Sequence, residues 1–181
     1  MTIATAWGVT GSEQHRSYPC DDLVPAPAQR LFRGVDVAAP PDVVYRWLCQ
    51  FRVAPYSYDW IDNAGRRSPR RPLPWTWDLE VGQTFSRIFT LVSFATDDHL
   101  TVRMNPAGAR MFGDVAVTYA VLPSGRERSR LVAVLRSPQP TSRPGAVGAW
   151  LLAWGDLVMM RKQLLTFAHL AAAEHGAQSS V

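Results

Sequence analysis

The sequence predicts a single α+β domain in which an antiparallel sheet is closed by one long C-terminal helix. Residues 146–175 are rich in Leu, Ala, Met, Arg and Gln, which are good helix formers, and they contain no proline. Residues 84–136 instead alternate apolar and polar side chains in short segments that turn residues separate. Strands gathered apart from helices are typical of α+β folds, and 181 residues are enough to bury a core.

The first part of the chain predicts an arm in front of this domain. Residues 1–29 are polar and interrupted by prolines, so we expect irregular structure there. Trp7 and Tyr18 indicate that the arm packs on the body of the protein, because free tails seldom carry such rings. We therefore expect an arm at 1–29, one domain at 30–176 and a disordered tail at 177–181.

The next elements are one strand and two short helices. Residues 31–37 alternate as in a strand. Pro41 suits the first turn of a helix, and Pro55 ends the helical pattern that follows it. Residues 58–64 predict a second short helix, and residues 65–74, which hold three prolines and four arginines without periodicity, predict a loop.

A meander of strands follows the loop. Alternating or β-rich segments are separated by Asp97-Asp98, by a break at 106–108 and by Ser124-Gly125, and they cover residues 84–94, 99–104, 115–121 and 131–136. Strands joined by such short connections predict antiparallel pairing. We expect this sheet to be curved, with the long helix across it.

The long helix is expected to be apolar over about half of its circumference, which is wider than the ~100° stripe of an ordinary surface helix. At 100° per residue, one arc holds Trp150, Trp154, Leu157, Val158, Leu164, Leu165, Ala168 and Ala172. We interpret this arc as the face that the sheet holds. Arg161 lies near the centre of the arc, where its charge either extends past its neighbours to water or faces a wet cavity.

Composition excludes several classes of function. The net charge of +4 rests on scattered arginines with a single lysine, and no basic helix or aromatic-interleaved basic patch predicts nucleic-acid binding. The chain has no basic and apolar leader and no apolar run of about 18 residues, so we expect a cytoplasmic protein without integral membrane association. Its association state is expected to be monomeric or homodimeric.

The sequence also lacks the motifs that would predict metal binding, nucleotide binding or covalent catalysis. Cys20 and Cys49 are far apart and are expected as free thiols, and no paired-cysteine or His-Glu-x-x-His motif is present. The sequence has no phosphate-binding loop, dinucleotide fingerprint or nucleophile elbow. We therefore expect no metal and no cofactor.

Four segments resemble the SRPBCC superfamily, which includes START, birch-pollen-allergen and polyketide cyclase proteins. They are VDVAAPPDVVYRWLCQ at 35–50, YSYDWIDNAGRRSP at 56–69, VGQTF at 81–85 and MMRKQLLTFAHLAAAE at 159–174. The arm segment GSEQHRSYPCDDLVP at 11–25 is similar to that of small bacterial members of this superfamily. The resemblance spans roughly residues 7–175 and implies a helix-grip fold with an internal cavity for an apolar small molecule.

Two functions fit this resemblance. The first is binding of a lipid-like or aromatic metabolite, and the second is cofactor-free cyclisation or dehydration of a polyketide held in the same cavity. Rings and apolar side chains expected near the cavity are the ligand-contact candidates, namely Tyr58, Trp77, Phe89, Met104, Tyr119, Trp154 and Leu157.

Polar candidates for proton transfer or charge stabilisation are His99, Arg103, Asp62 and Arg161. In the strand at 99–104, His99 and Arg103 share one face and Met104 belongs to the other. A register change of one residue exchanges the two faces, so either set could line the cavity. We favour the arrangement in which Met104 faces the cavity and His99 faces water.

Overall fold

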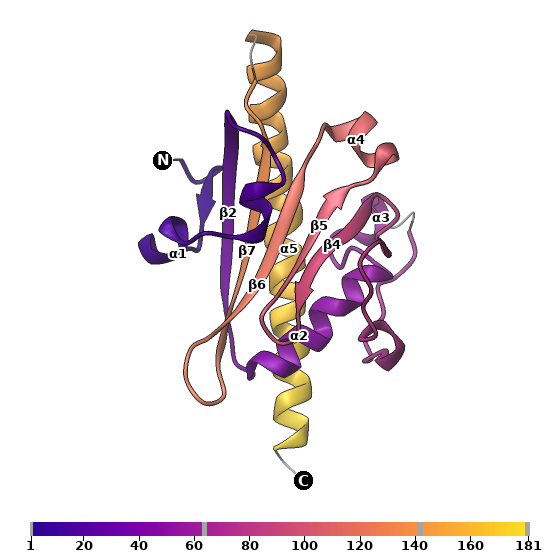
Figure 1. The fold of residues 1–181 in the computed structure, drawn as a ribbon. Helices are drawn as coiled ribbons and strands as arrows, with labels where there is room; N and C mark the ends of the chain where they lie inside the picture. The colour runs from indigo at the N-terminus through magenta and orange to yellow at the C-terminus, as the bar shows by residue number, and fades with distance from the viewer. Residues whose placement is uncertain (1, 63–64, 141–142, 180–181) are drawn as a thin grey trace.

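A computed structural model gives the fold, which is a seven-stranded sheet with a long helix across one face (Figure 1). It describes residues 2–62, 65–140 and 143–179, without the side chains of 62, 143–146 and 149. The strand order is β1-β2-β7-β6-β5-β4-β3, and all neighbours pair antiparallel except β1 with β2. The strand, short helices, meander and closing helix form the helix-grip arrangement that the resemblance implied.

The expected elements are present. The strands after the arm are β2 (Ala28–Val37), β3 (Thr84–Phe85), β4 (Phe89–Ala95), β5 (His99–Met104), β6 (Ala116–Pro123) and β7 (Ser129–Pro138). The helices of the first half are α2 (Pro41–Cys49), η2 (Gln50–Arg52), α3 (Asp59–Asp62) and η3 (Pro74–Thr76). The long helix is α5 (Arg143–Gln178), which runs two residues into the stretch predicted as a tail.

One α-helix after the arm was not predicted. Residues 106–108, expected only as a break, begin α4 (Pro106–Phe112). The Asn105 side chain accepts hydrogen bonds from the backbone N–H groups of Ala107 and Gly108, and Pro106 occupies the first helical position. Asn followed by Pro is thus a helix start here rather than a simple turn.

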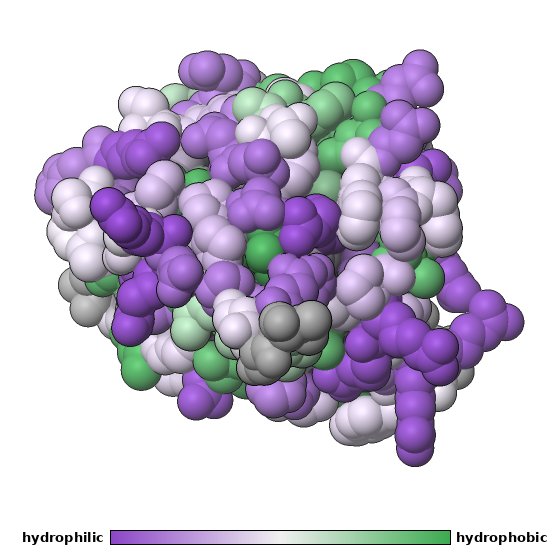
Figure 2. Space-filling model, turned by 90° about the horizontal axis from the view of Figure 1, so that it is seen from below, coloured by the Kyte–Doolittle hydropathy of each residue, from purple (hydrophilic) through white to green (hydrophobic). Residues whose placement is uncertain are grey.

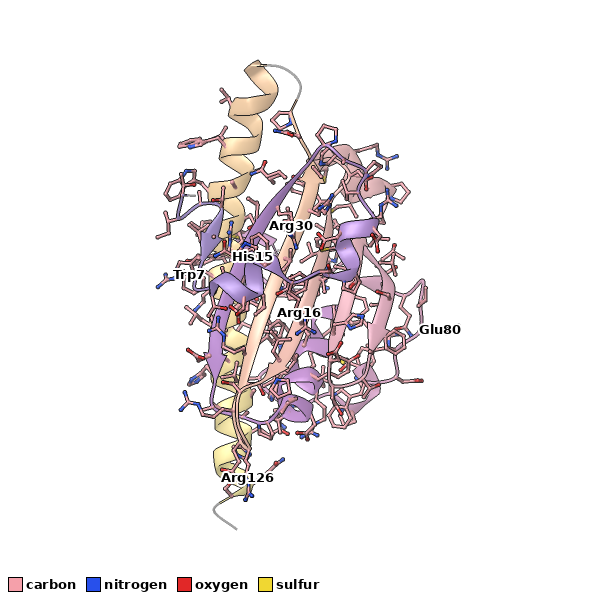
Figure 3. All side chains as sticks on the ribbon, turned by 60° about the vertical axis from the view of Figure 1, so that its left-hand side comes forward. Trp7, His15, Arg16, Arg30, Glu80 and Arg126 are labelled. Carbon is pink, nitrogen blue, oxygen red and sulfur yellow. The ribbon has the colours of Figure 1, made fainter. Side chains whose placement is uncertain are left out.

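The expectation of irregular structure in the arm is wrong, because the arm holds short regular elements, and these cover the outer face of the sheet. These are β1 (Ala6–Trp7), α1 (Gly11–His15) and η1 (Pro19–Asp22). Tyr18 and Cys20 pack in a small outer core with Phe32 and Val134. Figure 3 shows Arg16 and Arg30 on this arm-covered side of the sheet.

Two glycines allow β1 to lie against β2. Gly8 has φ +68°, and a Cβ on Gly8 would lie 2.2 Å from the Gly34 carbonyl oxygen. A Cβ on Gly34 would in turn meet the side chains of Arg130 and Val9. No larger residue fits such a backbone contact, so this pair fixes where the arm joins the sheet.

The inner core lies between the sheet, α2 and α5. Leu100 and Val102 of β5 point into it, with Met104 packed against it, whereas Thr101 bonds to Thr118 on the arm-covered face. Met104 therefore lies on the core side of the sheet, and its predicted contact with a ligand stays a prediction. His99 and Arg103 belong to the other face.

The apolar arc of α5 is divided between the core and the surface. Its buried side is formed by Ala153, Leu157, Met160, Leu164, Phe167 and Ala171. The prediction that the whole arc faces the sheet is wrong, because Trp150, Trp154, Val158 and Leu165 are exposed. The helix contacts chiefly β2 and α2, so one side of it is left uncovered.

Candidate functional site

Arg33 joins the three elements that surround the candidate site. It lies at an inward position of β2 and is fully buried. Its guanidinium donates hydrogen bonds to the carbonyl oxygens of Phe32, Ala4 and Ala153, at 2.8, 2.8 and 3.2 Å. Because Ala4 belongs to the arm and Ala153 to α5, this one side chain holds the arm and the long helix at fixed positions on the sheet.

The same guanidinium forms an ion pair with Asp156 of α5. The Arg33 Nη2 and Asp156 Oδ2 atoms are 2.8 Å apart, and the two side chains are 0% and 7% exposed. Burial raises the pKa of Asp156 to about 6, although the charge of Arg33 acts in the opposite direction. Burial likewise lowers the pKa of Arg33. This pair is held at a cost in desolvation, which is common for buried ion pairs.

A surface pocket of about 490 Å³ lies where the arm meets α5. It is lined by Ile3 and Trp7 of the arm, by Tyr58, and by Leu157, Val158, Arg161, Lys162 and Leu165 of α5. Figure 3 shows Trp7 on the short edge strand, beside α5. This volume lies in the range of small-molecule sites, and the lining combines apolar walls with a few polar groups.

Both cations of the pocket, Arg161 and Lys162, are consecutive residues of α5. The Arg161 Cζ atom lies 5.3 Å from the centre of the Trp7 ring, a cation–π geometry that orients the guanidinium. Within the described part of the chain, neither Arg161 nor Lys162 has a carboxylate at ion-pair distance. The pocket therefore offers uncompensated positive charge beside apolar walls.

Three of the predicted site residues come together here, namely Tyr58, Leu157 and Arg161. A second pocket, of about 330 Å³, lies on the other side of arm residues 2–5 and includes Trp150. Both pockets are at the surface around α5. The predicted ligand site was an internal cavity, whereas the pocket that collects the predicted residues is open.

The other predicted contact residues lie elsewhere. Phe89 and Tyr119 pack around Phe51 in the inner core, with ring centres 5.7 and 5.4 Å from that of Phe51. Met104 is packed against the same core. Trp77 lies under Arg46, 5.6 Å from the guanidinium carbon, and Trp154 faces outward in an edge-to-face pair with Trp150. These five rings and side chains do not line the pocket.

The buried Tyr119 is also hydrogen-bonded. Its hydroxyl donates to Gln163 Oε1 at 2.8 Å, and Gln163 Nε2 donates to the Pro55 carbonyl at 2.6 Å. Burial raises the pKa of Tyr119 far above its usual range. This chain of bonds links the sheet, α5 and the segment after α2, so it supports the fold around the site.

The remaining polar candidates are engaged away from the pocket. The Nδ1 atom of His99 lies 2.6 Å from the Asp98 carboxylate, and Arg103 makes two hydrogen bonds to Asp114. Asp62 ends α3, but its side chain lies outside the described residues. No group of three His, Cys, Asp or Glu residues that could hold a metal ion occurs in the part of the chain that is described.

Comparison with known proteins found solved structures of low similarity to this chain. No protein-family model matches this chain, and no curated protein matches it. A solution NMR structure from Thermobifida fusca is 16% identical with a TM-score of 0.47, over 78% of this chain and 94% of that one. The di-domain ARO/CYC StfQ from the steffimycin biosynthetic pathway is 13% identical to this chain, with a TM-score of 0.47. The match covers 85% of this chain and 52% of the StfQ chain.

Norcoclaurine synthase from Thalictrum flavum, solved in complex with dopamine and hydroxybenzaldehyde, is 14% identical with a TM-score of 0.43, over 84% of this chain and 92% of that one. Similarity of this degree concerns the fold and carries no ligand or reaction over to this chain. The chain has a helix-grip fold, and its arm and long helix border an open pocket with apolar walls and two cations. No described helix is long and apolar enough to cross a membrane.

Sequence reasoning missed the arm's part in the pocket. Ile3 and Trp7 form one wall, and the single lysine, Lys162, supplies the second cation. An aromatic ring in an otherwise polar arm was a usable signal, but it did not indicate which face the ring would cover. Arg33 was the usable signal for the arm's position. An arginine among apolar strand residues indicates a buried charge with a partner, and its pair with Asp156 holds α5 at the place where the arm meets it.

Proposed function

We propose that this protein binds a hydrophobic small molecule that carries an anionic group, in the pocket between the arm and α5. The observation that carries this proposal is the junction of apolar walls with the uncompensated charges of Arg161 and Lys162. The apolar body of the ligand would lie along Leu157 and Trp7, and its carboxylate, sulfate or phosphate would lie against Arg161. Tyr58 also lines the pocket and brings one further group that can form a hydrogen bond.

A pair of fluorescent probes of similar shape tests this proposal. Anilinonaphthalene sulfonate carries a negative charge, whereas N-phenylnaphthylamine has the same rings and no charge. The wild type should bind both and should prefer the anion. Arg161→Leu should weaken anion binding roughly tenfold, because a hydrogen bond to a charged group contributes about 1.5 kcal/mol, and should leave the neutral probe unchanged.

Arg126→Leu is the matched control, since Arg126 lies on the β6–β7 turn, far from Trp7 (Figure 3). It removes the same charge from the protein and should change neither affinity. Equal loss of both probes in Arg161→Leu would show that the variant has lost packing rather than a charge contact. Unchanged binding of the anionic probe would contradict the proposal.

Native mass spectrometry of protein purified from its own source separates binding from catalysis. An apolar anion that is recovered, and that stays unaltered when incubated with fresh protein, supports a binding protein. Turnover that Arg161→Leu abolishes would support cofactor-free cyclisation instead. His99→Ala and Arg103→Ala are further controls, because neither side chain lines the pocket, and both should retain binding.

A further inference from the structure

The exposed side of α5 carries an apolar seam with heptad spacing. The seam residues are Val147, Leu151, Trp154, Val158, Arg161 and Leu165, which are four, three, four, three and four residues apart. The apolar members are 60%, 58%, 38%, 51% and 42% exposed in that order, and the neighbouring Trp150 is 59% exposed. Alternating steps of four and three are the pattern by which one helix packs against another.

The seam is apolar over its whole first half. Of the described side chains between Val147 and Met160, only that of Asp156 is charged, and it turns inward to Arg33. An exposed helix face on a monomer is normally polar. Figure 2 shows the end of the molecule at which α5 terminates, where polar side chains predominate.

The size of the seam matches an interface. The exposed fractions of its apolar residues and of Trp150 correspond to on the order of 650 Å² of total residue surface. The largest patches on monomers reach about 300–600 Å², and each partner in a standard interface buries about 800 Å². Gly148 and Gly155, seven residues apart beside the seam, have open space where a Cβ would be, so another backbone can approach closely.

We propose that the seam pairs with the seam of a second copy of this chain, with the two α5 helices antiparallel. In a parallel pair, Arg161 and Lys162 would meet the partner's Arg161 and the partner's Lys162, and like charges would repel. An antiparallel pair separates these charges along the axis and also opposes the helix dipoles. Its two-fold axis lies near residue 156, so Trp154 meets the partner's Val158.

This pairing would complete the ligand pocket, an inference that rests on the proposed function. With the axis near residue 156, the partner's Leu151 lies opposite Arg161 and the partner's Val147 lies opposite Leu165. Arg161 and Leu165 line the pocket. The apolar half of each helix would therefore cover the open side of the other subunit's pocket, which would hold an apolar ligand away from water.

The association state of the full chain without ligand tests the seam. In sedimentation velocity the wild type should be a dimer at micromolar concentration. Trp154→Asp places a carboxylate in the seam twice per dimer, with no cation three or four residues away on its own helix, and should raise the dissociation constant at least about 100-fold. Met111→Glu is the matched control, because Met111 is 69% exposed on α4, away from the seam, and should leave the dimer intact.

Disulfide trapping tests the antiparallel register. Cys20 and Cys49 are buried, so only the engineered cysteines in the seam are accessible to form a disulfide between two chains. A mixture of Val147→Cys and Leu165→Cys proteins should form a cross-linked dimer, and each protein by itself should not. Cross-linking of each single variant by itself would show parallel helices and would overturn the covered pocket.

A wild type that stays monomeric, or a dimer that Trp154→Asp leaves unchanged, overturns the proposal. A monomer that binds phosphatidylcholine–phosphatidylglycerol vesicles, and loses this binding in Trp154→Asp, would instead assign the seam to a lipid surface. None of these outcomes alters the preference for the anionic probe over its neutral analogue. Failure of the dimer and failure of the binding site can therefore be distinguished.

Discussion

Replacing Arg33 with Met removes the cation that joins the arm, β2 and α5. The long apolar side chain of Met fills most of the space of the arginine stem. The carbonyl oxygens of Ala4 and Ala153 lose a hydrogen-bond donor, and the Asp156 carboxylate is left buried without its counter-ion. We expect the free energy of unfolding to fall by about 3–5 kcal/mol at pH 8, as when one partner of a buried ion pair is removed.

The contribution of Asp156 to the free energy of unfolding depends on pH. The pKa of Asp156 is about 6 in the folded protein, against an ordinary value of 3.8. The folded state therefore binds this proton more tightly than the unfolded state, and this group's stabilisation is largest below about pH 4 and falls as the pH rises to about 6. A shift of about two pKa units corresponds to roughly 3 kcal/mol.

A double variant isolates this contribution. Arg33→Met with Asp156→Leu removes both charges and should be as stable as the wild type at pH 7, or more stable by about 1–4 kcal/mol. Urea unfolding followed by tryptophan fluorescence measures both proteins from pH 4 to 8. The difference in free energy of unfolding between the wild type and the double variant should change by about 2–3 kcal/mol between pH 4 and 7. Parallel stability curves would refute the reasoning, since Asp156 would then titrate equally in both states.

Two further substitutions test the contacts that support the pocket. Tyr119→Phe leaves Gln163 Oε1 buried without its donor and should lower the free energy of unfolding by about 1–3 kcal/mol in urea titrations, whereas a change below about 0.5 kcal/mol would contradict this. Glu13→Gln weakens the contact between the arm and Arg130 and should cost about 1–2 kcal/mol at pH 7. Burial raises the pKa of Glu13, but hydrogen bonds from Arg130 and from the Thr10 backbone lower it overall, so the difference from the wild type should shrink as the pH falls below about 4. A difference that is constant between pH 7 and 3 would contradict this cause.

Local sequence signals predicted the main strands and the long helix, but not α4 or the short elements of the arm. The prolines at 40, 41 and 55 mark the limits of the first helical segment, and alternation places Leu100 and Val102 on one face of β5. The absence of proline after Pro144 predicts the long helix. These signals act between residues close in sequence, so they can be read without knowledge of the tertiary structure.

The site depended on contacts between distant parts of the chain. Sequence periodicity identified the apolar arc of α5, but it could not show that Leu157 is buried while Val158 and Leu165 are exposed. That division depends on where β2 and α2 meet the helix, and the buried pair of Arg33 with Asp156 fixes this position. Trp7 and Arg161 are more than 150 residues apart, and they meet because Gly8 and Gly34 let the arm lie against the sheet edge. An apolar pattern specifies that a side chain avoids water, whereas only the packed fold determines which neighbour covers it.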